Sequence, residues 1–67
     1  MSLANLRKGR GFKQKDIADK LGVAQATVAM WETGKSTPSF KNLCSLSELL
    51  QVSVNDICTA MQSKEDE

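Results

Sequence analysis

The residues of this chain best suited to do chemistry follow Val23, on the second of two short helices predicted between Gln14 and Thr33. Near the exposed start of that helix, four residues are candidates for contacting a ligand: Gln25, Ala26, Thr27 and Met30. A glutamine amide can form two hydrogen bonds with adenine, and a threonine hydroxyl can contact a base or a phosphate. Alanine and methionine offer only apolar contact, for example to a thymine methyl group. These side chains suit recognition of a ligand by hydrogen bonds and apolar contact, with no bond made or broken.

Catalysis and metal binding have little support in the composition. The chain has no histidine and no tyrosine, and its serine and threonine hydroxyls have no evident basic partner to activate them. Its two cysteines, Cys44 and Cys58, lie within apolar helical patterns, so we interpret them as small buried hydrophobic residues in a reducing compartment. A disulfide is an alternative, and a metal site is a weaker one, because the cysteines lack paired spacing. We therefore expect no enzyme activity, no metal and no cofactor.

The length of 67 residues allows one domain with a small core and leaves no room for a substrate cleft with a catalytic apparatus. A hydrophobic share of 40% and a charged share of 25% are ordinary for a soluble globular domain. No apolar run is long enough to span a bilayer, and no secretory signal opens the chain. Together these properties predict a small cytoplasmic domain.

The net charge of +1 hides an asymmetry along the chain. Residues 1–41 carry eight basic and three acidic side chains, whereas residues 42–67 carry one basic and five acidic side chains. The positive part contains both of the short helices predicted between Gln14 and Thr33. This distribution suits a basic face presented to a polyanion such as DNA. The alternative is a solvated basic surface with no partner.

Two helices joined by a tight turn must position the candidate residues. The apolar residues that would pack one helix on the other are Ile17, Leu21, Val23, Val28 and Trp31. Ala18 and Gly22 are small where the two backbones must approach, and Gly22 supplies the left-handed residue that ends the first helix. This is the helix-turn-helix pattern, in which the second helix lies in the major groove of DNA.

Hydrophobic spacing and helix-end residues predict an all-α fold of five helices. We expect them at about residues 2–10, 14–21, 25–32, 40–50 and from 54 onward. The expected N-caps are Ser2, Ser53 and either Thr37 or Ser39. The residues expected to complete the core are Leu3, Leu6, Phe12, Phe40, Leu43, Leu46, Leu50, Val54, Ile57 and Met61. Residues 1–62 would form a single domain, and the acidic segment 63–67 is expected to be disordered.

An ordered set of short segments spans most of the chain: Leu6-Arg7, Gln14, Ile17-Ala18, Leu21-Gly22-Val23, Val28, residues 31–35, Pro38-Ser39, Leu50 and residues 52–54. In this order, and with these gaps, the chain resembles the Cro/C1-type (XRE-like) helix-turn-helix domains of phage repressors and bacterial regulators. The resemblance covers about Leu3 to Ile57. It implies a compact five-helix, lambda-repressor-like domain that binds operator DNA, usually as a dimer on a palindromic site.

The resemblance also implies roles for residues around the recognition helix. The implied phosphate contacts are Lys13, Gln14, Thr33, Lys35, Ser36 and Ser39, with Lys41 a further candidate and with backbone amides of residues 33–36 taking part. For Gln14 the physics agrees, because a helix N-terminus attracts an anion; a capping or solvated side chain is the alternative. Lys13 stands where the family usually has serine or threonine, so it exchanges a cap for a charge. Arg7 and Glu32 resemble the family's internal ion pair, and a surface phosphate contact by Arg7 is the alternative.

The function predicted from these features is sequence-specific binding of duplex DNA by a transcriptional regulator, a repressor acting as a homodimer. The dimer surface is expected near the last helix and the end of the fourth; Leu49 either belongs to it or covers the edge of the core. The recognition helix has few hydrogen-bonding groups because it carries Ala24, Ala26, Ala29 and Met30. Direct reading would then be weak, and DNA shape would supply the rest. The alternative is a protein-interaction or antitoxin-like module with a protein partner and weak or lost specific DNA binding.

Overall fold

Five helices make up most of the structure, a computed structural model that describes residues 2–62. They are α1 (Leu3–Gly9), α2 (Gln14–Leu21), α3 (Gln25–Thr33), α4 (Phe40–Leu50) and α5 (Val54–Gln62). This part of the chain contains no strand, so the prediction of an all-α, lambda-repressor-like fold is confirmed. The bounds of α2 and α4 are those predicted. The acidic segment 63–67, expected to be disordered, lies outside the described residues.

Local signals determine where the helices begin and end. Three N-cap hydroxyls accept a hydrogen bond from the backbone N–H three residues later, at 3.1 Å for Ser2, 3.3 Å for Ser39 and 2.9 Å for Ser53. Ser39, not Thr37, is therefore the cap of α4. Gly22 ends α2 with φ at 73°, a left-handed conformation that costs glycine little. These ends make the turn between α2 and α3 as tight as the sequence predicted.

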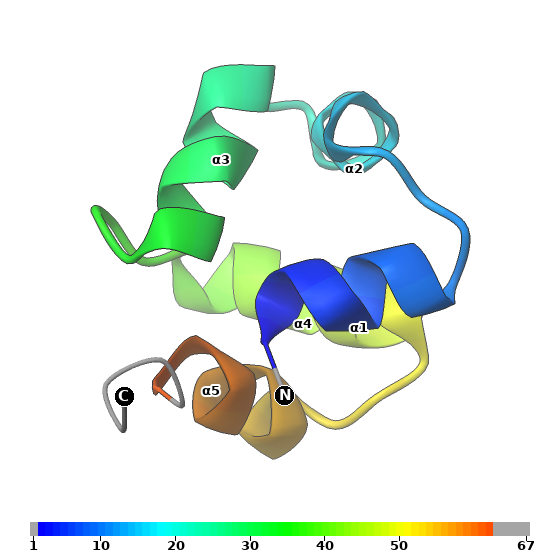
Figure 1. Cartoon of the computed structure of the whole chain (residues 1–67), viewed down its shortest axis with the longest axis vertical. Helices are drawn as coiled ribbons and strands as arrows, with labels where there is room; N and C mark the ends of the chain where they lie inside the picture. Colours follow the sequence, from blue (N-terminus) through cyan, green and yellow to red (C-terminus); the bar gives the residue numbers. More distant parts are fainter. Residues whose placement is uncertain (1, 63–67) are drawn as a thin grey trace.

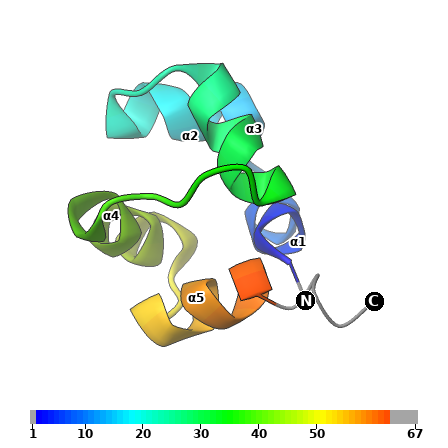
Figure 2. The ribbon, with the colours of Figure 1, turned by 90° about the vertical axis from the view of Figure 1, so that its left-hand side faces the viewer.

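The helix-turn-helix forms one end of the domain. α2 packs most extensively on α3, and α5 lies at the opposite end of the molecule (Figure 1 and Figure 2). Between them, α1 contacts α3 and α5, whereas α4 contacts α2 and α5. The outer side of α3 thus faces away from the other four helices (Figure 1). None of the helices in residues 2–62 has the length and apolar character needed to span a lipid bilayer.

All five helices contribute to one core. Its buried members are Leu3, Ile17, Ala18, Val28, Trp31, Leu46, Leu50 and Ile57. Trp31 is only 3% exposed, which confirms its predicted place behind the recognition helix. Leu49 is half-buried and packs against this core, so it covers the core edge. Ala60 is also buried, and the sequence analysis missed it because a lone alanine gives a weak apolar signal.

Phe40 does not join the core, and the prediction that it would was wrong. Its side chain is 73% exposed. The reason is helical phase, because Phe40 precedes Leu46 by six residues and therefore lies about 120° from it around the α4 axis. Phe40 is also the first residue of α4 after the Ser39 cap, so no earlier turn of helix covers it. The residue buried at this end of α4 is Pro38.

Candidate nucleic-acid interface

The outer face of α3 is open to solvent over most of its length. Val28 and Trp31 point inward and are 1% and 3% exposed. Of the base-reading candidates, Gln25, Ala26 and Met30 are exposed and Thr27 is half-buried. The buried side chains anchor α3 in the core, and the exposed side chains on its outer face are accessible to a ligand.

The start of α3 retains a partial positive charge. Ala24 is the N-cap, and its side chain has no oxygen to accept a hydrogen bond from the first turn. The leading N–H groups of a helix carry the positive end of its dipole, which favours an anion nearby. Gln25 is the first residue of α3, so it lies where the helix dipole attracts a phosphate or an electronegative base edge.

A chain of side-chain hydrogen bonds connects Gln25 to the interior. Gln25 Nε2 donates to Gln14 Oε1 at 3.4 Å, and Gln14 Nε2 donates to Glu32 Oε1 at 2.9 Å. Glu32 also accepts from Arg7, from Nε to Oε2 at 2.6 Å and from Nη2 to Oε1 at 3.4 Å. Arg7 Nη1 donates to the Phe12 carbonyl at 2.8 Å. The first residues of α2 and α3 are thereby tied to one buried carboxylate.

The ion pair between Arg7 and Glu32 is shielded from solvent. Their side chains are 10% and 9% exposed, respectively. Because Arg7 donates through three nitrogens within the protein, its guanidinium has little surface left for the phosphate contact considered as the alternative. A buried pair of this kind fixes geometry more reliably than it adds stability. Here it fixes the distance between α1 and the end of α3.

At the start of α2, a carboxylate of the first turn accepts a hydrogen bond from the N-cap residue's own backbone N–H. Lys13 is the N-cap, and because an ammonium cannot accept a hydrogen bond, it offers α2 no side-chain cap. Instead, the Lys13 backbone N–H donates to Asp16 Oδ2 at 2.8 Å. The Lys13 side chain is exposed and free to approach a polyanion. Further along α2, Lys15 pairs with Asp19 at 3.1 Å on the surface.

The loop after α3 presents side chains rather than backbone amides. The Met30 carbonyl accepts from the backbone N–H groups of Gly34, of Lys35 at 3.0 Å and of Ser36 at 3.4 Å, and from the Thr33 hydroxyl at 3.3 Å. These bonds end α3, with Gly34 at φ 84°. The amides implied as phosphate donors are thus directed inward in the protein on its own. Contact here would fall to side chains: the exposed Lys35, the half-buried Ser36, and Thr33 once its hydroxyl releases the Met30 carbonyl.

Two further phosphate candidates lie where α4 begins. The Ser39 hydroxyl caps α4 by accepting from the Asn42 N–H at 3.3 Å, which leaves its own proton available to donate. Lys41 is exposed one residue into the helix after Phe40. With Lys35, these residues place two ammonium groups and a hydroxyl on the segment that follows the recognition helix.

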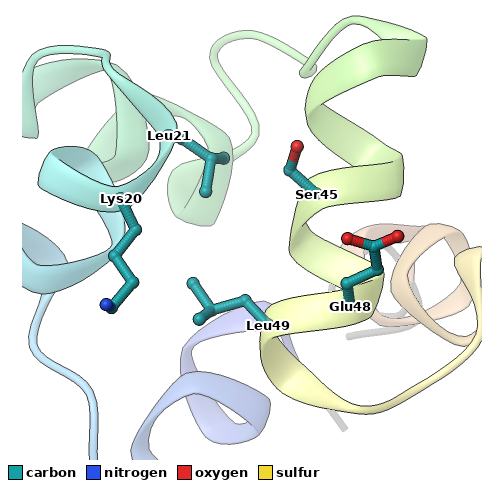
Figure 3. A pocket seen from close by; sticks show the side chains of 5 residues that line it. All are labelled: Lys20, Leu21, Ser45, Glu48 and Leu49. Atoms are coloured by element: carbon teal, nitrogen blue, oxygen red, sulfur yellow. The ribbon is translucent and has the colours of Figure 1, made fainter.

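Outside α3, the described residues include two cysteines and a groove that bear on metal binding and catalysis. No group of three potential ligands among histidine, cysteine, aspartate and glutamate could hold a metal ion in this range. Cys44 and Cys58 are free thiols, which rules out the disulfide alternative, and both are half-buried where the sequence predicts full burial. An open groove lies between α2 and α4 (Figure 3). Its lining residues are Lys20, Leu21, Ser45, Glu48 and Leu49, a set with no nucleophile and base in partnership.

Sequence reasoning did not foresee the hydrogen bonds made by Gln14. Its amide was expected to face a phosphate, but in the structure it bridges Glu32 and Gln25. Gln14 and Glu32 lie eighteen residues apart, and their contact depends on the angle at which α2 crosses α3. The signal that could have predicted these hydrogen bonds was the type of residue: a glutamine begins both α2 and α3, and a carboxylate lies near the end of α3.

Comparison with known proteins identifies the family to which the chain is similar. Residues 3–57 match the protein family described as helix-turn-helix. The chain is 28% identical, over 97% of its length, to the cryptic phage CTXphi transcriptional repressor RstR of Vibrio cholerae. It is 40% identical, over 70% of its length, to the HTH-type transcriptional regulator DicA of Escherichia coli. It is 36% identical, over 79% of its length, to the SPbeta prophage-derived uncharacterized HTH-type transcriptional regulator YonR of Bacillus subtilis.

The relatives are longer than this chain. The matched part covers 58% of RstR, 49% of YonR and 35% of DicA. The similarity therefore concerns the helix-turn-helix portion of these regulators. No solved structure matches the chain significantly.

Proposed function

Because the chain belongs to the Cro/C1-type helix-turn-helix family of DNA-binding regulators, we propose that it binds duplex DNA sequence-specifically and acts as a transcriptional repressor. In this proposal α3 lies in the major groove, whose width of about 12 Å admits one helix. The observation that carries the proposal is the two-sided character of α3: Val28 and Trp31 are buried behind it, and Gln25 and Met30 are exposed in front.

The proposed contacts divide into base reading and positioning. The base-reading residues are Gln25, Ala26, Thr27 and Met30. The phosphate-binding residues are Lys13, Gln14, Thr33, Lys35, Ser36 and Ser39. Phosphate contacts set the register of α3 in the groove, and base contacts give the preference for one sequence over another. With one amide and one hydroxyl among the four base-reading side chains, we expect a modest number of specified base pairs.

The test is a fluorescence anisotropy titration of the protein with pooled random duplex DNA at two salt concentrations. Binding that weakens steeply with salt indicates phosphate contacts, because each neutralised phosphate releases counterions. Lys35→Ala should reduce this salt dependence. Lys20→Ala is the matched control, since that exposed lysine lines the groove between α2 and α4 (Figure 3). A folded protein without detectable affinity for DNA at low salt would refute the proposal.

A homodimer is the form in which two copies of α3 would read a palindromic site. We place this assembly on bacterial operator DNA in the cytoplasm. The dimer surface expected from the sequence lies near α5 and the end of α4; the ring of Phe40, 73% exposed at the start of α4, is a second surface that favours contact with another copy. Sedimentation velocity at increasing protein concentration tests the assembly directly.

The second candidate is a protein-interaction or antitoxin-like module that uses the same fold. The exposed apolar side chains of Met30 and Phe40 favour it, since protein partners bury such groups readily. The salt titration separates the two candidates. Strong, salt-dependent affinity for duplex DNA supports the regulator, and a folded dimer with no affinity for DNA supports the interaction module.

A further inference from the structure

The groove between α2 and α4 carries opposite charges on its two walls (Figure 3). Lys20 lies on the α2 side and Glu48 on the α4 side, and both side chains are exposed. Leu21 and Leu49 lie between them and are half-buried. Within residues 2–62 the structure shows no hydrogen bond or ion pair for either charged side chain, so the two charges do not pair across the groove. The groove therefore combines an apolar centre with two opposite charges that lack a partner in the described chain.

The shape of the groove suits a protein better than a small molecule. Its volume of about 320 Å³ lies at the lower end of the range for small-molecule sites, which enclose most of the surface of their ligand. This groove is open, and its two charged side chains stand at the edges rather than converging on one point (Figure 3). An apolar centre with a charged rim is the anatomy of a contact between proteins.

The arrangement of the charges is self-complementary. An interface with two-fold symmetry brings the same surface of two copies together, so that every contact occurs twice. With the symmetry axis passing through the groove, Lys20 of each copy faces Glu48 of the other, and the leucines of both copies meet between the two ion pairs. A second copy of this chain thus supplies the charge that each wall lacks.

From this geometry we propose that the groove is the contact surface for a second copy of this chain. Its lining residues within the described chain are Lys20, Leu21, Ser45, Glu48 and Leu49, which come from α2 and α4 alone. The inference rests on the homodimer of the proposed function and names a surface for it, with α2 rather than α5 beside the end of α4. It does not depend on DNA binding. Because none of these lining residues belongs to α3, the contact leaves the outer face of α3 uncovered.

Reversing the charge on one wall tests the contact. Lys20→Glu and Glu48→Lys each place like charges opposite one another at both ends of the symmetric interface. We expect either variant to raise the dimer dissociation constant about tenfold or more, because like charges brought together at an interface are strongly unfavourable. Removing a charge without reversing it, as in Lys20→Ala, should change the dissociation constant by no more than about fivefold for each ion pair lost, since exposed pairs contribute little.

Reversing the charges on both walls should restore the association. The double variant, Lys20→Glu with Glu48→Lys, again has opposite charges on the two walls and should dimerise as the original protein does. An equimolar mixture of the two single variants should form a heterodimer, because one copy then has two acidic groups at these positions and the other has two basic groups. Sedimentation velocity over a range of protein concentrations measures each association.

Lys8→Glu is the matched control for these variants. Lys8 is an exposed lysine of α1, so its reversal gives the same change in net charge as Lys20→Glu but lies outside the groove. It should leave the dissociation constant unchanged. Salt provides a second control, because the Debye length falls to about 3 Å at 1 M. The difference between Lys20→Glu and the original protein should therefore shrink at high salt, with circular dichroism verifying that each variant is folded.

The possible outcomes separate this contact from the proposed binding of DNA. The proposal is supported if the single reversals lose association and both the double variant and the mixture regain it. It is overturned if the original protein stays monomeric up to millimolar concentration, if the single reversals associate as the original does, or if neither the double variant nor the mixture recovers. A protein that dimerises through the groove but binds no duplex would overturn the proposed DNA binding and leave this contact standing.

Discussion

Replacing Arg7 with methionine should destabilise this domain far more than an ordinary substitution of a charged residue. Arg7→Met removes a cation that makes three donor contacts, two to the Glu32 carboxylate and one to the Phe12 carbonyl. The Glu32 side chain is 9% exposed, so the remaining charge cannot recover its hydration. Of the side chains that donate to Glu32 in the structure, Gln14 alone would remain.

The expected loss follows from the cost of leaving a buried charge without its partner, about 3–5 kcal/mol. A chain of 67 residues has a total free energy of unfolding of roughly 3–10 kcal/mol, at about 0.05–0.15 kcal/mol per residue. The variant should therefore lose a large share of its stability. At about 4–8 °C per kcal/mol for a domain of this size, the Tm should drop by roughly 12 °C or more.

Urea denaturation followed by far-UV circular dichroism measures this loss, with the fluorescence of the buried Trp31 as a second probe. Lys15→Met is the matched control, because it breaks an ion pair with Asp19 whose side chains are 70% and 66% exposed. Its effect should stay below about 0.5 kcal/mol.

The double variant Arg7→Met with Glu32→Leu gives a further check. It should be more stable than Arg7→Met alone, since the penalty comes from the unpaired charge and not from the missing attraction. If the free energy of unfolding of Arg7→Met lay within about 0.5 kcal/mol of that of the original protein, the Glu32 carboxylate would have access to solvent and the reasoning would fail.

Three further substitutions probe the core, the DNA contact and the assembly. Trp31→Ala should cost about 3–5 kcal/mol and unfold much of the domain; a Tm near that of the original protein in thermal denaturation would contradict its burial at 3% exposure. Lys35→Ala should weaken binding to all duplexes about equally and lower the slope of log affinity against log salt by about 1, and a loss confined to one sequence would refute the phosphate contact. Phe40→Ser should weaken self-association in sedimentation velocity while changing the monomer's stability by less than about 0.5 kcal/mol; an unchanged dimer dissociation constant would remove Phe40 from the interface.

The helices could be predicted from the sequence because their ends are encoded locally. α2 runs over residues 14–21 and α4 over residues 40–50, as expected. Gly22 adopts the left-handed conformation that ends α2, and Ser39 accepts the hydrogen bond that begins α4. Such signals act over three or four residues, so they can be recognised in the sequence without knowledge of the tertiary structure.

What sequence reasoning could not supply depends on how the helices are placed against one another. Phe40 fits an apolar pattern along α4, yet its phase leaves it 73% exposed. Gln14 was assigned to a phosphate on the strength of its place at a helix start, yet its amide also reaches Glu32 at 2.9 Å. The contact of Gln14 depends on the crossing angle between α2 and α3, which no local pattern specifies, whereas the phase of Phe40 could have been read from its spacing to Leu46.

The scarcity of polar groups on α3 makes the orientation of each one matter more. Gln25 is the one exposed amide among the proposed base-reading residues, and its exposed neighbours Ala26 and Met30 offer apolar contact only. An amide that rotates freely can satisfy several base edges and therefore discriminates weakly. In the structure the Gln25 amide donates to Gln14 at 3.4 Å, which restricts its rotation in the protein on its own. In this domain the ion pair between Arg7 and Glu32 fixes α1 against the end of α3, and the hydrogen bonds of Gln14 connect that pair to the start of α3.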